Sequence, residues 1–142
     1  ILSELTQDRE RNRLIVSDIS RELRNGGGTC LVLSDRRAHC ETIRAMLQAA
    51  GVASDVLTGT TPERDRKDIV SRLNAGDIRV LIATGQLIGE GFDCSRLSTL
   101  FLTTPIKFDG RLIQYLGRVL RPAPQKSKAV IYDYVDVEVG AL

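Results

Sequence analysis

The sequence predicts an α/β fold, built on a mostly parallel sheet with helices on both faces. Several short segments are mainly apolar, among them residues 29–34 and 97–102, and such segments are typical of strands buried on both faces. Between them lie longer segments in which apolar residues recur at helical spacing. This alternation favours parallel strands, because each crossover helix then covers one face of the sheet.

The composition describes one globular domain. The chain has 142 residues, of which 42% are hydrophobic and 27% are charged. No apolar run reaches the length of a membrane span and the charged N-terminal segment lacks a signal-peptide pattern, so we expect no membrane partner. The cysteines Cys30, Cys40 and Cys94 have no C-x-x-C spacing, which argues against disulfides and a zinc site and favours a reducing, cytoplasmic location. We expect His39 to serve packing or the surface rather than catalysis.

The first helix is predicted at residues 5–24. Ile15, Ile19 and Leu23 recur there every four positions between charged faces, which is the pattern of a helix with one buried side. The glycines of residues 25–28 end this helix, since glycine readily adopts the left-handed backbone of a helix exit.

The next elements are a strand at residues 29–34 and a helix at residues 36–50. Asp35 or Ser34 is expected to cap this helix, and Gly51 is expected to stop it. Each prediction follows from the position of a short polar side chain or a glycine at a helix end.

A short strand at residues 55–57 precedes a third helix. Thr61 is expected to cap this helix and Pro62 to take its first position, and Ala75–Gly76 is expected to end it. A fourth helix is predicted at residues 110–120. Three further strands are expected, at residues 79–83, 97–102 and 129–135.

The fourth helix has two distinct sides. Gln114, Arg118 and Arg121 fall within a narrow sector with Arg111 beside them, and apolar residues fall opposite. Residues 105–128 hold six Lys or Arg and one acid, so positive charge is concentrated here. Guanidinium groups match phosphate oxygens, and two of them one turn apart could grip a terminal phosphate. The alternative is a solvated basic face.

Polar segments follow several strands, where ligands of parallel sheets gather. Ser34–Arg37 offers a hydroxyl, helix amides and the charge of Arg36, and Thr58–Thr61 offers hydroxyls and amides. Plain helix caps and turns are the alternatives. Thr84–Asp93 contains three glycines that let amides approach a ligand, and Asp93 could accept a hydrogen bond from a ribose hydroxyl. No G-x-G-x-x-G motif is present.

The order of these segments resembles the motifs of superfamily 2 helicases. Ala83-Thr84-Gly85-x4-Glu90-Gly91-Phe92-Asp93 resembles motif V, and Gln114-x2-Gly117-Arg118-x2-Arg121-Pro122 resembles motif VI. Leu31-Val32-Leu33-Ser34 with Arg36 is similar to motif IV, and Leu57-Thr58-Gly59 with Arg66 to the segment between IV and V. The resemblance covers residues 10–136 and implies the second, RecA-like lobe of such an enzyme.

The resemblance also implies roles for single residues. Arg118 and Arg121 would reach the γ-phosphate of ATP across the cleft between two lobes, with Gln114 beside them, and Gly91 and Asp93 would lie near the ribose. The residues implied to line the nucleic-acid backbone are Ser34, Arg36, Thr58, Gly59 and Thr84.

Departures from the DEAD-box pattern favour DNA over RNA. Gln114 stands where those RNA helicases usually have histidine, Gly85 replaces the common aspartate of motif V, and Glu90 replaces an arginine. These choices look more like the restriction-enzyme and repair type of DNA helicase.

The sequence lacks the motifs of the nucleotide-binding lobe of such a helicase. No Gly-Lys pair exists to form a phosphate loop, and no Asp-Glu pair exists to hold magnesium. We therefore expect residues 1–142 to be a single second motor lobe, part of a longer protein whose first lobe precedes Ile1 and binds most of the ATP and Mg²⁺. The parent is also expected to continue beyond Leu142.

Two other functions are compatible with parts of the pattern. A helicase-like lobe could bind nucleic acid or a protein without ATP chemistry, although the arginine pair speaks against this reading. An unrelated doubly wound enzyme, such as a sugar-nucleotide transferase, could use the glycines and Asp93 to hold a nucleotide. That reading leaves the spacing from Gln114 to Arg121 unexplained.

Overall fold

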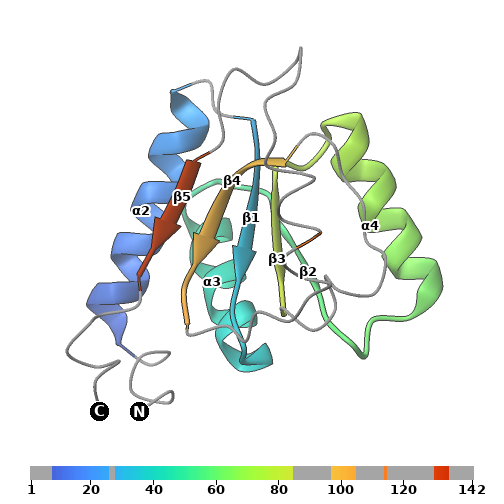
Figure 1. Cartoon of the computed structure of the whole chain (residues 1–142), viewed down its shortest axis with the longest axis horizontal. Coiled ribbons are helices and arrows are strands. Elements are labelled where there is room, and N and C mark those ends of the chain that lie inside the picture. The colour runs from blue at the N-terminus through green and yellow to red at the C-terminus, as the bar shows by residue number, and fades with distance from the viewer. Residues whose placement is uncertain (1–7, 26–27, 85–96, 105–113, 115–129, 135–142) are drawn as a thin grey trace.

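The computed structural model describes residues 8–25, 28–84, 97–104, 114 and 130–134. Within these residues it forms a sheet of five strands in the order β2-β3-β1-β4-β5, and every neighbouring pair is parallel (Figure 1). The strands are β1 (Thr29–Leu33), β2 (Asp55–Leu57), β3 (Val80–Ala83), β4 (Leu97–Leu102) and β5 (Val130–Asp133). The helices are α2 (Arg9–Arg24), α3 (Arg37–Ala49) and α4 (Glu63–Ala75).

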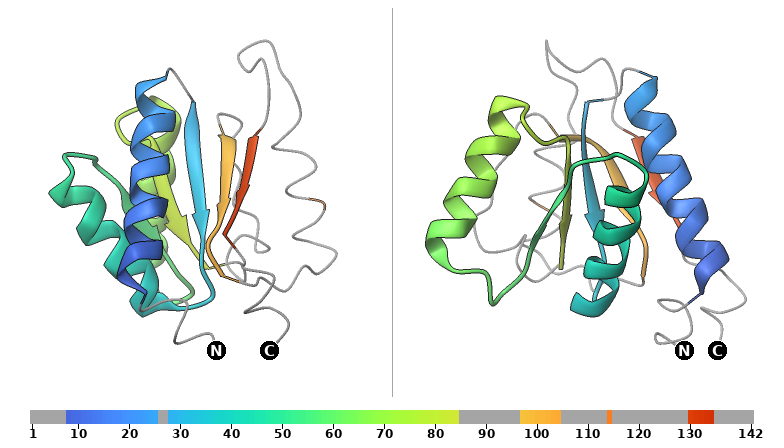
Figure 2. Two further views of the ribbon diagram at one scale, coloured as in Figure 1. Left: turned by 90° about the vertical axis from the view of Figure 1, so that its left-hand side faces the viewer. Right: turned by 180° about the vertical axis from the view of Figure 1, so that it is seen from behind.

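The predicted α/β architecture is confirmed, with helices on both faces of the sheet. Neighbouring residues of one strand enter different cores: Val32 joins the cluster of α2 and α3, while Leu33 joins the cluster of α4. Ile19 of α2 and Ile43 of α3 are fully buried in the first cluster, and Leu73 of α4 is fully buried in the second. Figure 2 shows α2 and α3 together on one side of the sheet.

Helix α2 begins later than the sequence pattern predicts. Asp8 has extended backbone, and its carboxylate accepts a hydrogen bond of 3.1 Å from the backbone N–H of Arg11. This cap starts the helix at Arg9 rather than near residue 5, because a capping side chain replaces the missing helical partner of a first-turn N–H. Residues 1–7 lie outside the described part of the chain.

The predicted N-caps of α3 and α4 are wrong, although the helices themselves are confirmed. Arg36 occupies the N-cap of α3 without a capping side chain, because Ser34 is turned into the core. Pro62 occupies the N-cap of α4, and the Thr61 hydroxyl instead accepts a 3.0 Å hydrogen bond from the N–H of Thr58. Gly76 ends α4 with a φ of 85°, as predicted from glycine.

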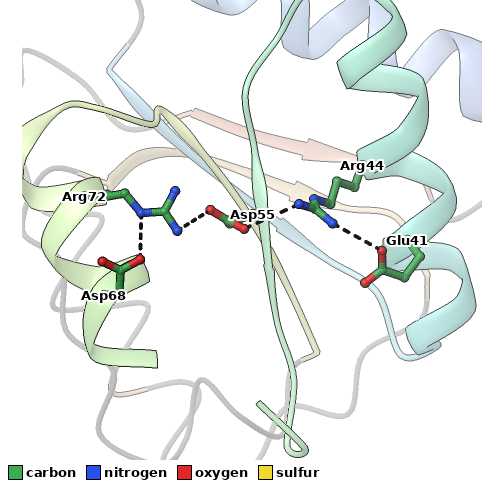
Figure 3. Close-up of polar contacts among 5 residues, drawn as sticks. All are labelled: Glu41, Arg44, Asp55, Asp68 and Arg72. Carbon is green, nitrogen blue, oxygen red and sulfur yellow. Dashed lines mark hydrogen bonds and ion pairs between the residues drawn. The ribbon is translucent and has the colours of Figure 1, made fainter. Parts of the chain in front are cut away.

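The amino end of β2 is joined to two helices by ion pairs. Asp55 at the start of β2 lies between Arg72 of α4, at 2.7 Å, and Arg44 of α3, at 3.8 Å (Figure 3). The same two arginines also pair with Asp68 and Glu41. This network ties both helices to the amino end of β2.

The edge strand β5 is fastened to α2 through two tyrosines. Tyr132 and Tyr134 stack against Phe101, and their hydroxyls donate to Glu22 at 2.8 Å and to Asp18 at 2.6 Å. Burial and the hydrogen bond to Asp18 raise the pKa of Tyr134, so its hydroxyl stays a donor. In the described part of the chain, no helix is long and apolar enough to cross a membrane.

Candidate nucleic-acid interface at the carboxyl edge

Four neighbouring strands end in hydroxyl residues along one edge of the sheet. The residues that follow β2, β3, β1 and β4 are Thr58, Thr84, Ser34 and Thr103, in the order of the sheet. We call this row the carboxyl edge. The strand ladder continues one residue into it, because the Ser34 N–H donates to Ala83 and the Thr103 N–H donates to Leu33. The row is therefore held in register by the sheet itself.

Ser34 is fully buried and belongs to a hydrogen-bonded network with His39 and Asn12. His39 Nδ1 lies 2.9 Å from Ser34 Oγ, and His39 Nε2 lies 2.9 Å from Asn12 Oδ1. Burial, reinforced by the nearby charge of Arg11, lowers the pKa of His39 to about 4, so the imidazole is neutral at pH 7. This agrees with the expected packing role of His39, which is buried and does not lie at the surface.

The turn after β2 is braced internally and from α3. The Thr61 N–H donates to the Thr58 carbonyl at 3.0 Å, and the hydroxyls of Thr58 and Thr60 lie 3.1 Å apart. Arg37 Nη1 donates to the Thr60 hydroxyl at 2.8 Å, which links the start of α3 to the turn after β2. Gly59 is exposed at the tip, and an added Cβ would meet nothing within 4 Å. Its backbone is therefore open to a ligand.

Sequence reasoning missed the contribution of Thr103 and Thr104 after β4. The Thr103 hydroxyl donates to the Leu33 carbonyl at 2.7 Å, and the Thr104 hydroxyl accepts from the Asp35 N–H at 2.9 Å. Arg11 Nη2 donates to the Thr103 carbonyl at 3.0 Å. A threonine pair directly after an apolar strand was the available signal, since it marks a polar strand end in a parallel sheet.

Positive charge is exposed beside this edge. Arg36 and Arg37 are both exposed at the amino end of α3, where the helix dipole and free amides favour an anion. Asp35 is exposed next to them and offsets part of this charge. The arrangement offers two guanidiniums on a rigid helix start, in reach of one strand edge.

The structure brings together the residues predicted to line nucleic acid. Arg36 and Gly59 are exposed, Thr84 is half-buried, and Ser34 and Thr58 are buried at the same edge. Gln114 has helical backbone and an exposed side chain. The other residues predicted at the nucleotide site, Gly91, Asp93, Arg118 and Arg121, lie outside the described residues.

Comparison with known proteins places this fold and its motifs in a family. A family model of the helicase conserved C-terminal domain matches residues 11–123. The chain is 26% identical over 135 residues to IRC3 of Saccharomyces cerevisiae, a protein assigned as an ATP-dependent helicase, covering 94% of this chain and 19% of IRC3. It is 29% identical over 112 residues to UvrABC system protein B of Chlamydia trachomatis serovar D, covering 75% of this chain and 17% of that protein.

A solved structure shows the same fold. The helicase domain of Pyrococcus furiosus Hef superposes with a TM-score of 0.68 at 19% identity, over 89% of this chain and 26% of that chain. This chain spans about a fifth of the length of IRC3 and of UvrABC system protein B. The family match over most of the residues, the parallel sheet and these likenesses agree. This chain belongs to the helicase conserved C-terminal domain family and is a RecA-like C-terminal lobe of the superfamily 2 helicase type.

Proposed function

We propose that this lobe grips a nucleic-acid backbone with its carboxyl edge, as the second motor lobe of an ATP-dependent helicase or translocase. The observation that supports the proposal is the exposed Arg36 and the open backbone of Gly59, which flank a row of strand ends that the sheet holds in register. Amides, hydroxyls and guanidiniums bind phosphates without reading bases. Binding through such groups is insensitive to sequence and depends on salt.

The proposed ATP chemistry is shared between two lobes. ATP with Mg²⁺ would be held mainly by a first lobe of the same polypeptide and would supply the phosphoryl group whose transfer drives motion. In this chain, Arg118 and Arg121 would contact the γ-phosphate and stabilise the charge that develops there, with Gln114 beside them. Gly91 and Asp93 would lie near the ribose.

We further propose that the substrate is DNA and that the protein works in the cytoplasm. The departures at Gln114, Gly85 and Glu90 from the DEAD-box pattern support DNA. Cys30 and Cys40 are free and buried, and burial raises the pKa of each thiol to about 12. Free cysteines are typical of proteins in a reducing compartment.

Arg36→Ala is the direct test of the proposed interface. Labelled oligo(dT) and oligo(U) would be titrated with the 142-residue chain at several salt concentrations. We expect Arg36→Ala to weaken binding to all oligonucleotides about equally. The slope of log affinity against log salt should fall by about 0.7, the value for one phosphate contact on a single strand.

Arg24→Ala is the matched control for this experiment. Arg24 is also exposed, and it lies in the last turn of α2, at the amino ends of the strands. It should leave affinity and salt slope unchanged. Equal losses in the two variants would mean that net charge alone drives binding, and a changed base preference in Arg36→Ala would contradict the backbone role.

A further inference from the structure

The Asn12–His39–Ser34 network connects three separate elements inside the core. Asn12 comes from α2, His39 from the first turns of α3, and Ser34 from the end of β1. The three residues are 3%, 2% and 0% exposed. Both contacts of the imidazole are 2.9 Å long, so the ring is held from two sides. The far end of the network is the turn that carries Arg36.

The network has one consistent direction of hydrogen bonding. Asn12 Oδ1 can only accept, so the His39 Nε2–H donates to it. The Nδ1 atom of the neutral ring must then accept, and the Ser34 hydroxyl donates to it. The lone pairs of Ser34 Oγ are left to face the backbone N–H of Arg36, which lies 3.3 Å away. The position of α2 is thereby linked to the backbone at Arg36.

The energetic cost of burying these polar groups points to a positioning role for His39 in addition to packing. An apolar side chain would fill the same buried space without desolvating an imidazole, an amide and a hydroxyl. A buried network whose members are paired instead specifies one geometry for the elements that it joins. Here it joins α2 and α3 to the turn between β1 and α3, at the carboxyl edge.

We infer that His39 is a positioning residue of the nucleic-acid interface, which through Ser34 holds the Arg36 turn in the geometry that grips a phosphate. This inference rests on the proposed function, because it gives the turn its ligand. His39 touches neither nucleic acid nor nucleotide in this scheme. It acts through Ser34, and its effect on binding must therefore depend on Arg36.

Two amide substitutions of His39 separate its contact with Ser34 from its contact with Asn12. The amide of glutamine can reach the position of Nε2, so His39→Gln keeps a donor for Asn12 and leaves Ser34 without its acceptor. The shorter amide of asparagine can reach the position of Nδ1, so His39→Asn keeps an acceptor for Ser34. Ser34→Ala removes the same contact with the smallest change of volume, and it serves where His39→Gln does not fold.

The experiment measures oligo(dT) affinity and thermal unfolding of the 142-residue chain. We expect His39→Gln and Ser34→Ala each to weaken binding about three- to tenfold, in the lower part of the range for coupled contacts, and His39→Asn to retain most of the affinity. In the Arg36→Ala background, His39→Gln should have little further effect on binding. Ile43→Val is the control: it is fully buried on α3 outside the network, and it should lower the melting temperature without changing affinity.

Each outcome decides the inference. If the losses of affinity from His39→Gln and Arg36→Ala were additive, His39 would not act through Arg36 and the positioning role would be wrong. An equal loss of affinity in Ile43→Val would likewise leave His39 with a purely structural role. Normal binding by His39→Gln beside a weakened Arg36→Ala would overturn positioning while the interface stands. Absence of oligo(dT) binding by the unmodified chain would overturn the interface and this inference together.

Discussion

His39 shows how one buried side chain can set the pH response of the whole lobe. Its pKa is lowered to about 4 by burial first and by the charge of Arg11 second, whereas an unfolded chain titrates near its ordinary value of about 6.5. Between these values the unfolded state binds a proton that the folded state excludes. The contribution of His39 to stability is therefore fully present above pH 6.5 and is lost as the pH falls towards 4.

This linkage predicts a measurable loss of stability in mild acid. The free energy of unfolding should fall by on the order of 3 kcal/mol between pH 6.5 and 4 through His39 alone. Urea unfolding at pH 7, 6, 5 and 4 would measure the fall, with His39→Gln as the comparison. Carboxylates titrate in both proteins, so the difference between their slopes of unfolding free energy against pH is due to His39. Parallel slopes would contradict the prediction.

At the scale of elements, the ion pairs of Asp55 join two helices that cover opposite faces of the sheet. Asp55 is the shared partner of Arg72 on α4 and Arg44 on α3, and its side chain is 18% exposed (Figure 3). The arginine side chains are 37% and 45% exposed, so water and salt screen much of the attraction. The network holds β2 in place. This strand lies at the edge of the sheet and is only three residues long.

Asp55→Asn should destabilise the lobe by about 1 kcal/mol, since it leaves two guanidiniums facing each other without their common carboxylate. The effect should shrink as salt is added, because screening weakens the pairs that are lost. Urea unfolding at low and high salt measures both quantities. Glu41→Gln is the control: Glu41 is 61% exposed and pairs with Arg44 at 3.8 Å, so its loss should cost less than about 0.5 kcal/mol. Equal costs in the two variants would contradict a special role for Asp55.

At the scale of the whole molecule, the proposed ATP cycle needs two lobes. This chain contains the arginines expected to reach the γ-phosphate and no phosphate loop to hold it. We therefore expect the 142-residue chain to show no ATP turnover by phosphate release, even with single-stranded DNA present. ATP turnover by the pure chain, after contaminating enzymes are excluded, would contradict the proposal that ATP is bound mainly by the first lobe.

In a protein that joins this lobe to its first lobe, Arg118→Ala and Arg121→Ala should each abolish most DNA-stimulated turnover. Arginines of this kind contribute on the order of 10³–10⁵ in rate, while nucleotide affinity and melting temperature should change little. Lysine at either position should not restore activity, because it lacks the planar fork of donors. Near-normal turnover in both alanine variants would remove the proposed role, and full activity with lysine would show that charge alone suffices.

The sequence alone was sufficient for the architecture and the family. The strand at Leu97–Leu102 has the predicted bounds, because leucine and phenylalanine dominate a strand that the sheet buries on both faces, and that pattern is visible in the sequence. The end of α4 at Gly76 was equally predictable, since a left-handed exit requires glycine locally. The motifs placed Ser34, Thr58 and Thr84 at strand ends, and parallel pairing brings those ends to one edge.

Only the tertiary structure decided what the polar side chains do. Ser34 and Thr61 are good caps by local rules, yet Ser34 bonds to a histidine on the next helix and Thr61 bonds back to Thr58. Asn12 is 27 residues from His39 in sequence, and their contact exists because α2 packs beside α3 on the same face. Apolar burial follows a local period that a sequence displays. A hydroxyl or an imidazole takes whichever partner the packed elements bring within 3 Å, and that partner is set by the fold as a whole.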